Sequence, residues 1–340
     1  MTIKDIARES GYSVGTVSRV LNQAPGVSDT ARTKIMAVVD KYHFRLNSNA
    51  KQLKQQSSNG IAIIVKGTQN MLFADLVEQL QRTIELKGYA CMLFYINEDD
   101  NEVEHAVQIC RERHPAGILF LGSNQRYYRE YFGAIDVPCI LVTNSAASLR
   151  LPNLSSVSTD DETAAQFAVD HLITLGHRQI GILGGKTAIS FAAFSRYQGC
   201  AKALAQHHIP FLPQKQYEEA HFSMSEGYYA MERLLQKMPE LTGVFAMSDV
   251  MAIGAIRAIR DKGLRVPEDI SVVGFDGLDL SMYMTPRLTT IRQYKEGIVQ
   301  RSIEILLGCI EDKNPAVHEV VPFQFIPGES VQKYRGNSIG

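Results

Sequence analysis

Residues 2–22 read TIKDIARESGYSVGTVSRVLN, and this stretch decides how the chain is organised. Thr2 and Asp5 have capping-box spacing, so a helix is expected to begin there, and Gly11 permits the left-handed backbone that ends a helix. Ser13 follows after one further residue and is a favourable N-cap for a second helix. The apolar face of that second helix is expected to consist of Val17, Val20 and Leu21.

A third helix is expected to start at Ser28 and to repeat the apolar spacing with Ile35, Val38, Val39 and Tyr42. Three short helices with a glycine turn between the first two are typical of a helix-turn-helix, although any small three-helix bundle has the same pattern. Residues 1–58 carry nine Lys/Arg against four Asp/Glu, a net charge of +5, which leaves −6 for the remainder. A basic block at one end of an acidic chain indicates a polyanionic partner.

The composition is that of a globular protein with more than one domain, at 340 residues, 45% hydrophobic and 21% charged. Its five cysteines are scattered without CxxC spacing, which indicates free thiols in a reducing compartment. No apolar signal region follows Met1 and no stretch approaches the ~18 apolar residues of a membrane span, so a cytoplasmic location is expected. Neither a cofactor nor a metal is expected.

From residue 60 the pattern changes to alternating strands and helices. Apolar runs at 60–65, 89–95, 117–121 and 137–142 predict buried parallel strands. The alternation then restarts, with Asp160 and Asp161 capping a helix that Gly176 ends, and with further strands at 179–183, 244–247 and 271–275. The pattern predicts two doubly wound α/β lobes with a ligand cleft at the carboxyl ends of their strands.

These stretches resemble the lactose-repressor (LacI/GalR) family of transcription regulators. Residues 2–22 resemble its headpiece, residues 47–53 its hinge helix, and residues 171–180, 248–254 and 266–276 its core, which is like a periplasmic sugar-binding protein. The resemblance implies an all-α helix-turn-helix headpiece joined to α/β lobes. Its expected parts are a headpiece over 1–46, a hinge helix over 47–58, a first lobe over 59–158 and 291–321, and a second lobe over 159–290 and 322–340.

The resemblance also implies a function. The expected protein is a homodimeric, sequence-specific repressor of a carbohydrate-use operon, which binds palindromic operator DNA and responds to a sugar or sugar-phosphate effector. Control by a protein corepressor, as in catabolite-control regulators, and action as an activator remain open. A free-standing sugar-binding protein or an enzyme would leave the headpiece unexplained, and no GxGxxG, HExxH or GxSxG motif is present.

DNA contacts are expected from the second helix, lying in the major groove. Val14, Gly15 and Arg19 match the family's base-reading positions, and Arg19 can donate a bidentate pair to guanine. Phosphate contacts are expected from hydroxyl and amide side chains, each of which has a helix-capping or solvated role as its alternative: Ser13, Thr16, Ser18, Asn22 and Ser28.

By the same resemblance, the hinge helix pairs with that of a second subunit in the minor groove, where Leu53 wedges between base steps beside Ala50. Leu46 stands where the family usually has a proline.

For the effector, Arg196 matches the arginine that grips the ligand, Asp276 the acid that accepts from it, and Phe222 the aromatic that stacks on it. Three further contacts are expected from position alone, namely Phe73, Ser123 and Ser190. Core packing is the alternative for Phe73 and Phe222. The chain has no tryptophan, so stacking must come from Phe or Tyr.

Three positions depart from the family pattern. Thr143 stands where an acid is frequent, Ser248 where an asparagine is frequent, and Lys295 where one member has an aromatic. A lost acid and a gained lysine favour an anionic ligand, such as a sugar phosphate. His177 is expected to be structural, and Gly184-Gly185-Lys186 to be a turn and not a phosphate loop.

Overall fold

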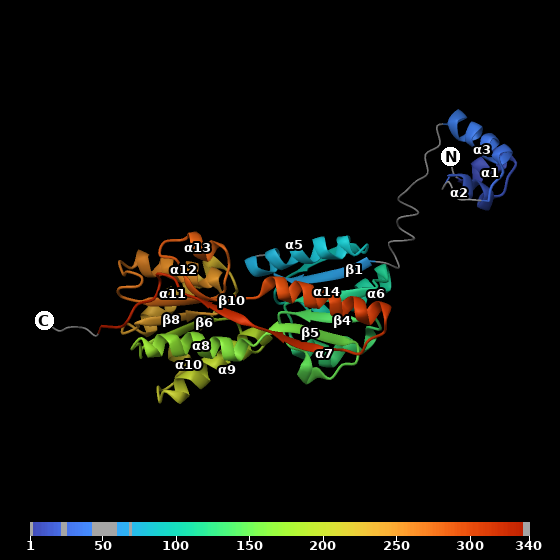
Figure 1. Ribbon diagram of the computed structural model, residues 1–340. Coiled ribbons are helices and arrows are strands. Elements are labelled where there is room, and N and C mark those ends of the chain that lie inside the picture. Colours follow the sequence, from blue (N-terminus) through green and yellow to red (C-terminus); the bar gives the residue numbers. More distant parts are fainter. Residues whose placement is uncertain (1–2, 22–25, 43–59, 68–69, 336–340) are drawn as a thin grey trace. The chain divides into compact units, whose positions relative to one another are not determined.

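The structure, a computed structural model, describes residues 3–21, 26–42, 60–67 and 70–335. The chain forms two compact units, Met1–Ser57 and Ser58–Gly340, here termed the N-terminal and C-terminal units (Figure 1).

In its described residues, 3–21 and 26–42, the N-terminal unit contains the helices α1 (Ile3–Ser10), α2 (Val14–Leu21) and α3 (Asp29–Lys41). Gly11 has a φ of +75°, which confirms the predicted left-handed turn between α1 and α2. Ser28 caps α3, because its hydroxyl accepts from the amide of Ala31 at 3.4 Å. The three helices bury one small apolar core, made of Ile6, Ala7, Val17, Val20, Ile35 and Val39.

Two six-stranded sheets form the C-terminal unit. The first has the order β11-β5-β4-β3-β1-β2 and the second β12-β10-β9-β8-β6-β7. All neighbouring strands are parallel except β10 and β12, which are antiparallel. The bounds are β1 Gly60–Lys66, β2 Ala90–Ile96, β3 Gly117–Leu121, β4 Cys139–Val142, β5 Leu154–Thr159, β6 Ile180–Gly184, β7 Tyr217–Glu219, β8 Gly243–Ala246, β9 Ser271–Asp276, β10 Thr289–Gln293, β11 His318–Val321 and β12 Phe323–Ile326.

Helices cover both faces of each sheet, so each is doubly wound as predicted. In the first lobe α5 and α14 pack on one face and α6 and α7 on the other. In the second lobe α11 and α12 pack on one face and α8 and α9 on the other. The bounds are α5 Met71–Leu86, α6 Glu102–Arg113, α7 Gln125–Tyr131, α8 Asp161–Thr174, α9 Phe191–Gln206, α10 Pro213–Gln216, α11 Met224–Lys237, α12 Asp249–Asp261, α13 Leu280–Tyr283 and α14 Lys295–Glu311.

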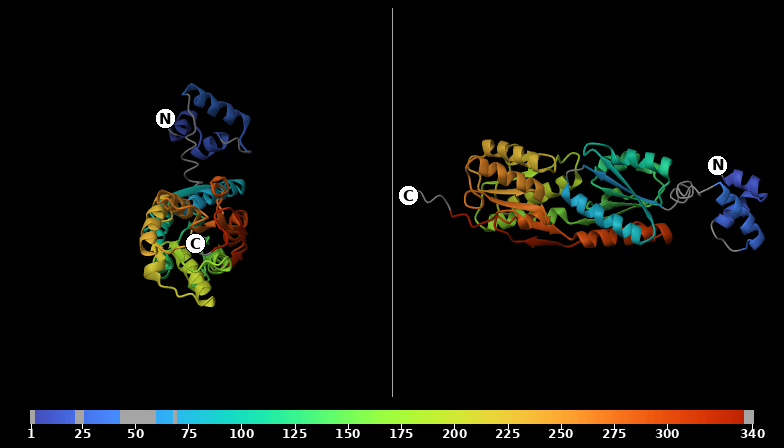
Figure 2. Two further views of the ribbon diagram at one scale, coloured as in Figure 1. Left: turned by 90° about the vertical axis from the view of Figure 1, so that its left-hand side faces the viewer. Right: turned by 90° about the horizontal axis from the view of Figure 1, so that it is seen from above.

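The chain passes between the lobes three times, from β5 to α8, from β10 to α14 and from β11 to β12. We call residues 159–161 the first crossover, 293–295 the second and 321–323 the third. The right-hand view of Figure 2 shows the two lobes end to end, with the red C-terminal segment running along both. If one lobe moves relative to the other, the backbone must therefore bend at these three segments.

The sequence prediction omitted several strands, among them β7 and the two C-terminal strands β11 and β12. These are short strands at the edges of the sheets, and their burial is incomplete. They lack the continuous apolar run that marked the predicted strands. The prediction also omitted the inner strands β5 and β10, whose sequences LSSVST and TTIRQ are largely polar.

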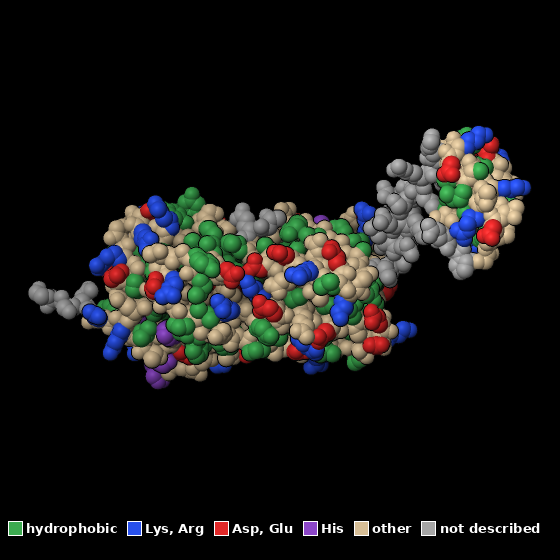
Figure 3. Space-filling view, turned by 45° about the horizontal axis from the view of Figure 1, so that its top comes forward, with side chains coloured by type: hydrophobic (Ala, Val, Ile, Leu, Met, Phe, Trp, Pro, Cys, Tyr) green, Lys and Arg blue, Asp and Glu red, His purple; other side chains and the backbone are tan. Residues whose placement is uncertain are grey.

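On the face drawn in Figure 3, basic and acidic side chains of the C-terminal unit are interspersed, without a field of one sign. Cys139 and Cys200 are buried, the other three cysteines are partly buried, and all five are free thiols. None of the helices in the described residues has the length and apolar character needed to cross a membrane.

Candidate functional site

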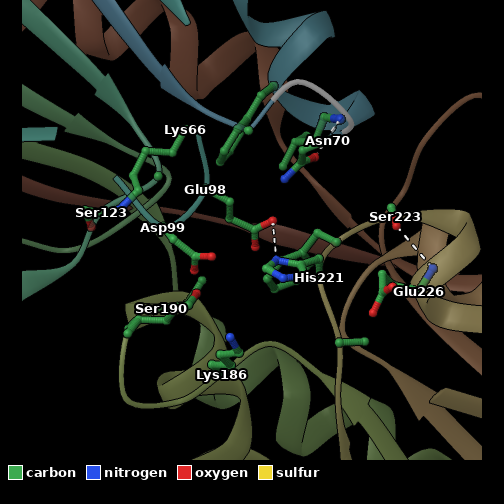
Figure 4. A pocket seen from close by; sticks show the side chains of 18 of the residues that line it. Lys66, Asn70, Glu98, Asp99, Ser123, Lys186, Ser190, His221, Ser223 and Glu226 are labelled. Atoms are coloured by element: carbon green, nitrogen blue, oxygen red, sulfur yellow. Dashed lines mark hydrogen bonds and ion pairs between the residues drawn. The ribbon is translucent and has the colours of Figure 1, made fainter. Parts of the chain in front are cut away.

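A cavity of about 470 Å³ lies between the two lobes, at the carboxyl ends of their parallel strands. The structure brings together in it all six residues predicted as effector contacts: Phe73, Ser123, Ser190, Arg196, Phe222 and Asp276. Their role as ligand contacts stays a prediction, but their convergence is a property of the fold. In Figure 4, Lys66 and Ser123 lie on one side of the cavity and Ser223 and Glu226 on the other.

Arg196, on α9, is 4% exposed and is held from three sides. Its Nε donates to Asp161 Oδ1 at 2.8 Å, and its Nη1 donates to the carbonyl of Met247. Its guanidinium carbon lies 3.7 Å from the centroid of the Phe275 ring, which is a cation–π contact. This arginine is therefore both a wall of the cavity and part of the core of its lobe.

Asp276 ends β9 with a φ of 108°, an uncommon backbone conformation for a residue with a side chain. Its Oδ1 accepts from Gln293 Nε2 at 2.9 Å and lies 3.9 Å from Arg196 Nη1. Burial raises the pKa of Asp276 to about 6, against the opposing effects of Arg196 and of the Gln293 hydrogen bond. The carboxylate is thus poised to accept a hydrogen bond near neutral pH.

Two phenylalanines line the cavity from opposite lobes. Phe222 follows β7 and lies so close to Gly185 that a Cβ there would stand 2.7 Å from the ring. Phe73, on α5, packs against the first-lobe core and lies near Gly122, where a Cβ would stand 3.3 Å from the ring. Both side chains pack against a core and also line the cavity. Core packing and ligand contact, the two alternatives for these residues, are therefore compatible.

The first-lobe wall contains two buried polar atoms without a partner in the described part of the chain, Ser123 Oγ and Asn144 Oδ1. Beside them, Lys66 Nζ pairs with Glu102 Oε2 at 2.8 Å, and both side chains are buried. Burial raises the pKa of Glu102, and the charge of Lys66 opposes this. Unsatisfied buried polar groups are uncommon, so this wall is suited to a polar ligand.

Charged residues line the rim of the cavity. His221 Nδ1 lies 2.9 Å from Glu98 Oε2, and this contact joins the second lobe to the first (Figure 4). Lys186, Asp99 and Glu226 complete the charged lining.

Lys295, which motivated an anionic ligand, is not among the lining residues. Its Nζ pairs with Asp75 at 2.7 Å, so its charge is already neutralised. Thr143 does line the cavity. Ser248 is buried and caps α12, since its hydroxyl accepts from the amide of Met251.

The sequence analysis missed the lining residues Lys66, Glu98 and His221. It also missed the roles of Asp161 and Gln293, which bind Arg196 and Asp276. Asp161 was identified only as a helix cap, and Gln293 lies 17 residues from its partner Asp276. No local pattern reveals such pairings, because folding alone brings these side chains together. His177, predicted to be structural, is buried between Thr242 Oγ1 and the carbonyl of Gln332. Among the described residues, no group of three or more His, Cys, Asp or Glu side chains could hold a metal ion.

In the N-terminal unit, α2 presents its predicted base-reading residues to the surface. Val14 is 42% exposed, Arg19 is exposed, and a Cβ on Gly15 would meet only the Ser13 hydroxyl at 3.8 Å. Ser13 caps α2, because its hydroxyl accepts from the amide of Thr16 at 3.1 Å and lies 2.9 Å from the Thr16 hydroxyl.

These capping bonds do not exclude phosphate contacts, which remain predictions for Ser13, Thr16, Ser18 and Ser28. Three residues of the predicted interface lie outside the described residues, namely Asn22, Ala50 and Leu53, and so does Leu46, which precedes the expected hinge helix.

A helix-turn-helix unit joined to a two-lobed ligand-binding unit defines a ligand-responsive DNA-binding regulator. Residues 2–47 match the family model described as bacterial regulatory proteins, lacI family, and residues 169–331 match a periplasmic binding protein-like domain.

The chain is 33% identical over 336 residues to the HTH-type transcriptional regulator MalR of Clostridium butyricum, covering 97% of this chain and 99% of that protein. It is 30% identical to the ribose operon repressor of Haemophilus influenzae, covering 92% and 93%. A lac repressor dimer bound to operator and the anti-inducer ONPF has a TM-score of 0.78 and 27% identity, covering 98% of this chain and 99% of that one.

The chain belongs to the lacI family of bacterial regulatory proteins. Its relatives are named as transcription regulators and not as enzymes.

Proposed function

We propose that this protein is a cytoplasmic transcriptional repressor that binds a palindromic operator as a homodimer and responds to a small sugar held between its two lobes. The observation that carries the proposal is the convergence of six predicted ligand contacts, drawn from both lobes, in one cavity. The sequence placed the lobes at residues 59–158 with 291–321 and 159–290 with 322–340. We propose to move two of these limits, because β5 keeps Thr159 in the first lobe and β10 keeps residues 291–293 in the second. The relatives named as repressors favour repression over activation.

The chemistry of the cavity suits a polyhydroxylated ring. Phe222 and Phe73 offer apolar faces, and Asp276 offers a carboxylate that accepts from hydroxyl groups. Ser123 Oγ and Asn144 Oδ1 have no partner among the described residues, so ligand hydroxyl groups would satisfy them. A purely apolar ligand would instead bury these polar groups unpaired, which is costly.

The charges of the cavity favour a neutral sugar over a sugar phosphate. Two of its buried cations are already neutralised, Lys66 by Glu102 and Arg196 by Asp161. At the rim, three carboxylates stand against Lys186 and His221. A phosphate would enter this acidic surrounding without an unpaired buried cation to receive it.

The sugar site is tested by calorimetric titration of the full chain with ribose, glucose, cellobiose, ribose 5-phosphate and glucose 6-phosphate. We expect at least one neutral sugar to bind, and Asp276→Asn to weaken it strongly. Asp170→Asn is the matched control, because Asp170 pairs with His207 on the surface of the same lobe. Equal effects of the two substitutions would refute the site, and tighter binding of the phosphates would refute the preference for a neutral ligand.

The DNA interface is tested on an operator selected from a random DNA pool with the wild-type chain. Arg19→Ala should lose about 1–3 kcal/mol of discrimination for the selected sequence. Lys34→Ala removes the same charge from α3 and should weaken binding to all sequences alike. If Arg19→Ala keeps the wild-type sequence preference, Arg19 does not read bases.

A further inference from the structure

A buried chain of polar groups runs from the cavity to two of the three crossovers. Gln293, at the start of the second crossover, is 1% exposed. Its Oε1 accepts from Thr159 Oγ1 at 3.0 Å, and its Nε2 donates to Asp276 Oδ1 at 2.9 Å. The amide orientation follows from its neighbours, because a carboxylate can only accept whereas a hydroxyl can donate. One side chain thus joins the cavity carboxylate to both the first and the second crossover.

Arg196 completes a second connection from the cavity to the first crossover. Asp161, the last residue of that crossover, accepts from Arg196 Nε at 2.8 Å, and Arg196 Nη1 lies 3.9 Å from Asp276. Thr159 and Asp161 therefore bracket the first crossover, and each contacts a group that is bound in turn to Asp276. The second crossover is held also at its far end, where Lys295 pairs with Asp75 on α5.

We propose that Gln293 is a positioning residue that couples occupancy of the cavity to the arrangement of the two lobes. A ligand hydroxyl that donates to Asp276 Oδ1 competes with Gln293 for the same oxygen. When the hydrogen bond from Gln293 to Asp276 weakens, the Gln293 amide can move. Its movement alters the hydrogen bond that it accepts from Thr159, on the first crossover. The ligand would then bind one arrangement of the crossovers more tightly than the other. A ligand shifts the equilibrium between two arrangements only through such a difference in affinity.

This proposal rests on the proposed function, in which Asp276 contacts the sugar, but its first test needs no ligand. Gln293→Met removes both hydrogen bonds at similar length, and Thr159→Val removes one of them at constant shape. Thr159→Ser, which keeps the hydroxyl, is the matched control. Amide hydrogen exchange at residues 159–161 and 293–295 is compared with exchange at β1 and β8 in the lobe cores.

Gln293→Met and Thr159→Val should each speed exchange at both crossovers together, by about fivefold for one lost hydrogen bond, and leave the lobe cores unchanged. Thr159→Ser should match the wild-type chain.

In an NMR titration of the Asp276 carboxyl, Gln293→Met should raise the pKa of Asp276, because the Gln293 hydrogen bond lowers that pKa. If exchange rises only at the substituted crossover, Gln293 does not couple the two segments. Should Gln293→Met fail to fold, Thr159→Val against Thr159→Ser decides the question alone.

The second test measures coupling with the selected operator and the neutral sugar that the wild-type chain binds best among ribose, glucose and cellobiose. At a sugar concentration that saturates each variant, the ratio of operator affinities with and without sugar should fall to near one in Gln293→Met. A wild-type ratio would overturn the proposal. If none of the three sugars binds the wild-type chain, the proposed sugar specificity fails, and the exchange experiment still decides the connection between the crossovers.

Discussion

Individual residues of the cavity carry two roles at once, and Arg196 is the clearest case. It lines the cavity, yet it also neutralises Asp161. Burial raises the pKa of Asp161, and the charge of Arg196 limits this rise. From the sequence, Arg196 had only the role of gripping a ligand. The structure adds a structural role, so a test of ligand binding at this position must separate it from stability.

Arg196→Ala should cost about 3–5 kcal/mol in free energy of unfolding, because Asp161 would remain buried without its partner. Chemical denaturation of the full chain measures this loss. The double variant with Asp161→Ala removes both charges and should recover part of it. A loss below about 1 kcal/mol for the single variant would show that the pair contributes little.

Asp276 predicts a pH dependence of ligand binding. Its pKa is about 6, so the carboxylate is ionised at pH 7.5 and mostly protonated at pH 5. A sugar that donates to the carboxylate should therefore bind about tenfold more weakly one pH unit below this pKa. Calorimetry between pH 5 and pH 7.5 tests this with the sugar found above, and Asp276→Asn should abolish the dependence. A flat profile in the wild-type chain would contradict it.

The same shift affects stability with the opposite sign. Burial raises the pKa of Asp276 from 3.8 to about 6, so the folded chain holds this proton where the unfolded chain has lost it. The contribution of Asp276 to the free energy of unfolding therefore falls as pH rises from about 4 to about 6.

At the scale of secondary structure, the N-caps decide where the functional elements begin. Ser13 caps α2, Ser28 caps α3 and Ser190 caps α9, each accepting from a backbone amide of the first turn. The α2 cap fixes the direction from which Val14 and Arg19 project, and Ser190 starts the helix that carries Arg196. The caps thus connect short sequence signals to the placement of site residues.

Ser13→Ala should lower the stability of α2 by about 1 kcal/mol, the usual effect of losing a serine N-cap. Hydrogen exchange of the α2 amides in the full chain should rise accordingly, and affinity should weaken for all DNA sequences alike. Ser10→Ala is the control. The Ser10 hydroxyl belongs to α1, where it donates a hydrogen bond to the carbonyl of Ala7 at 3.4 Å, and it does not cap α2. Unchanged exchange in α2 after Ser13→Ala would show that the cap is dispensable.

Elements with strong local signals were predictable from the sequence. The helices α2 and α3 have caps and regular apolar spacing, and most inner strands are apolar on both faces because helices cover both. The inner strands β5 and β10 are the exception, since their sequences LSSVST and TTIRQ are largely polar. The edge strands β7, β11 and β12 lack that signal. The convergence of Arg196, Asp276 and Phe222 was expected only through the family resemblance. The bond between Thr159 and Gln293 joins residues 134 positions apart, and no local rule reaches that far.

At the scale of the whole molecule, the charge is divided between the parts. Residues 1–58 carry +5 and the remainder −6. A basic DNA-binding unit attached to an acidic body favours contact with DNA through one end only, because the acidic remainder is repelled by phosphates.

This division predicts different salt dependences for the two ligands. Raising salt from about 50 to about 200 mM should weaken operator binding by several orders of magnitude, because bound counterions are released from DNA. Binding of a neutral sugar should change less than about twofold over the same range, since no net charge is neutralised. Parallel titrations of DNA and sugar measure both slopes. A steep slope for the sugar would indicate that the ligand is charged after all.

The two C-terminal strands have a consequence for biosynthesis. β11 forms one of the two outer strands of the first sheet and β12 one of those of the second, so residues 318–326 complete both lobes. Translation at about 5–20 residues per second delivers the DNA-binding helices first and this segment almost last. A nonsense mutation between codons 58 and 318 would leave both lobes unfinished while sparing the headpiece. Truncated alleles of this gene should therefore encode chains that keep the DNA-binding helices but do not bind or respond to a ligand.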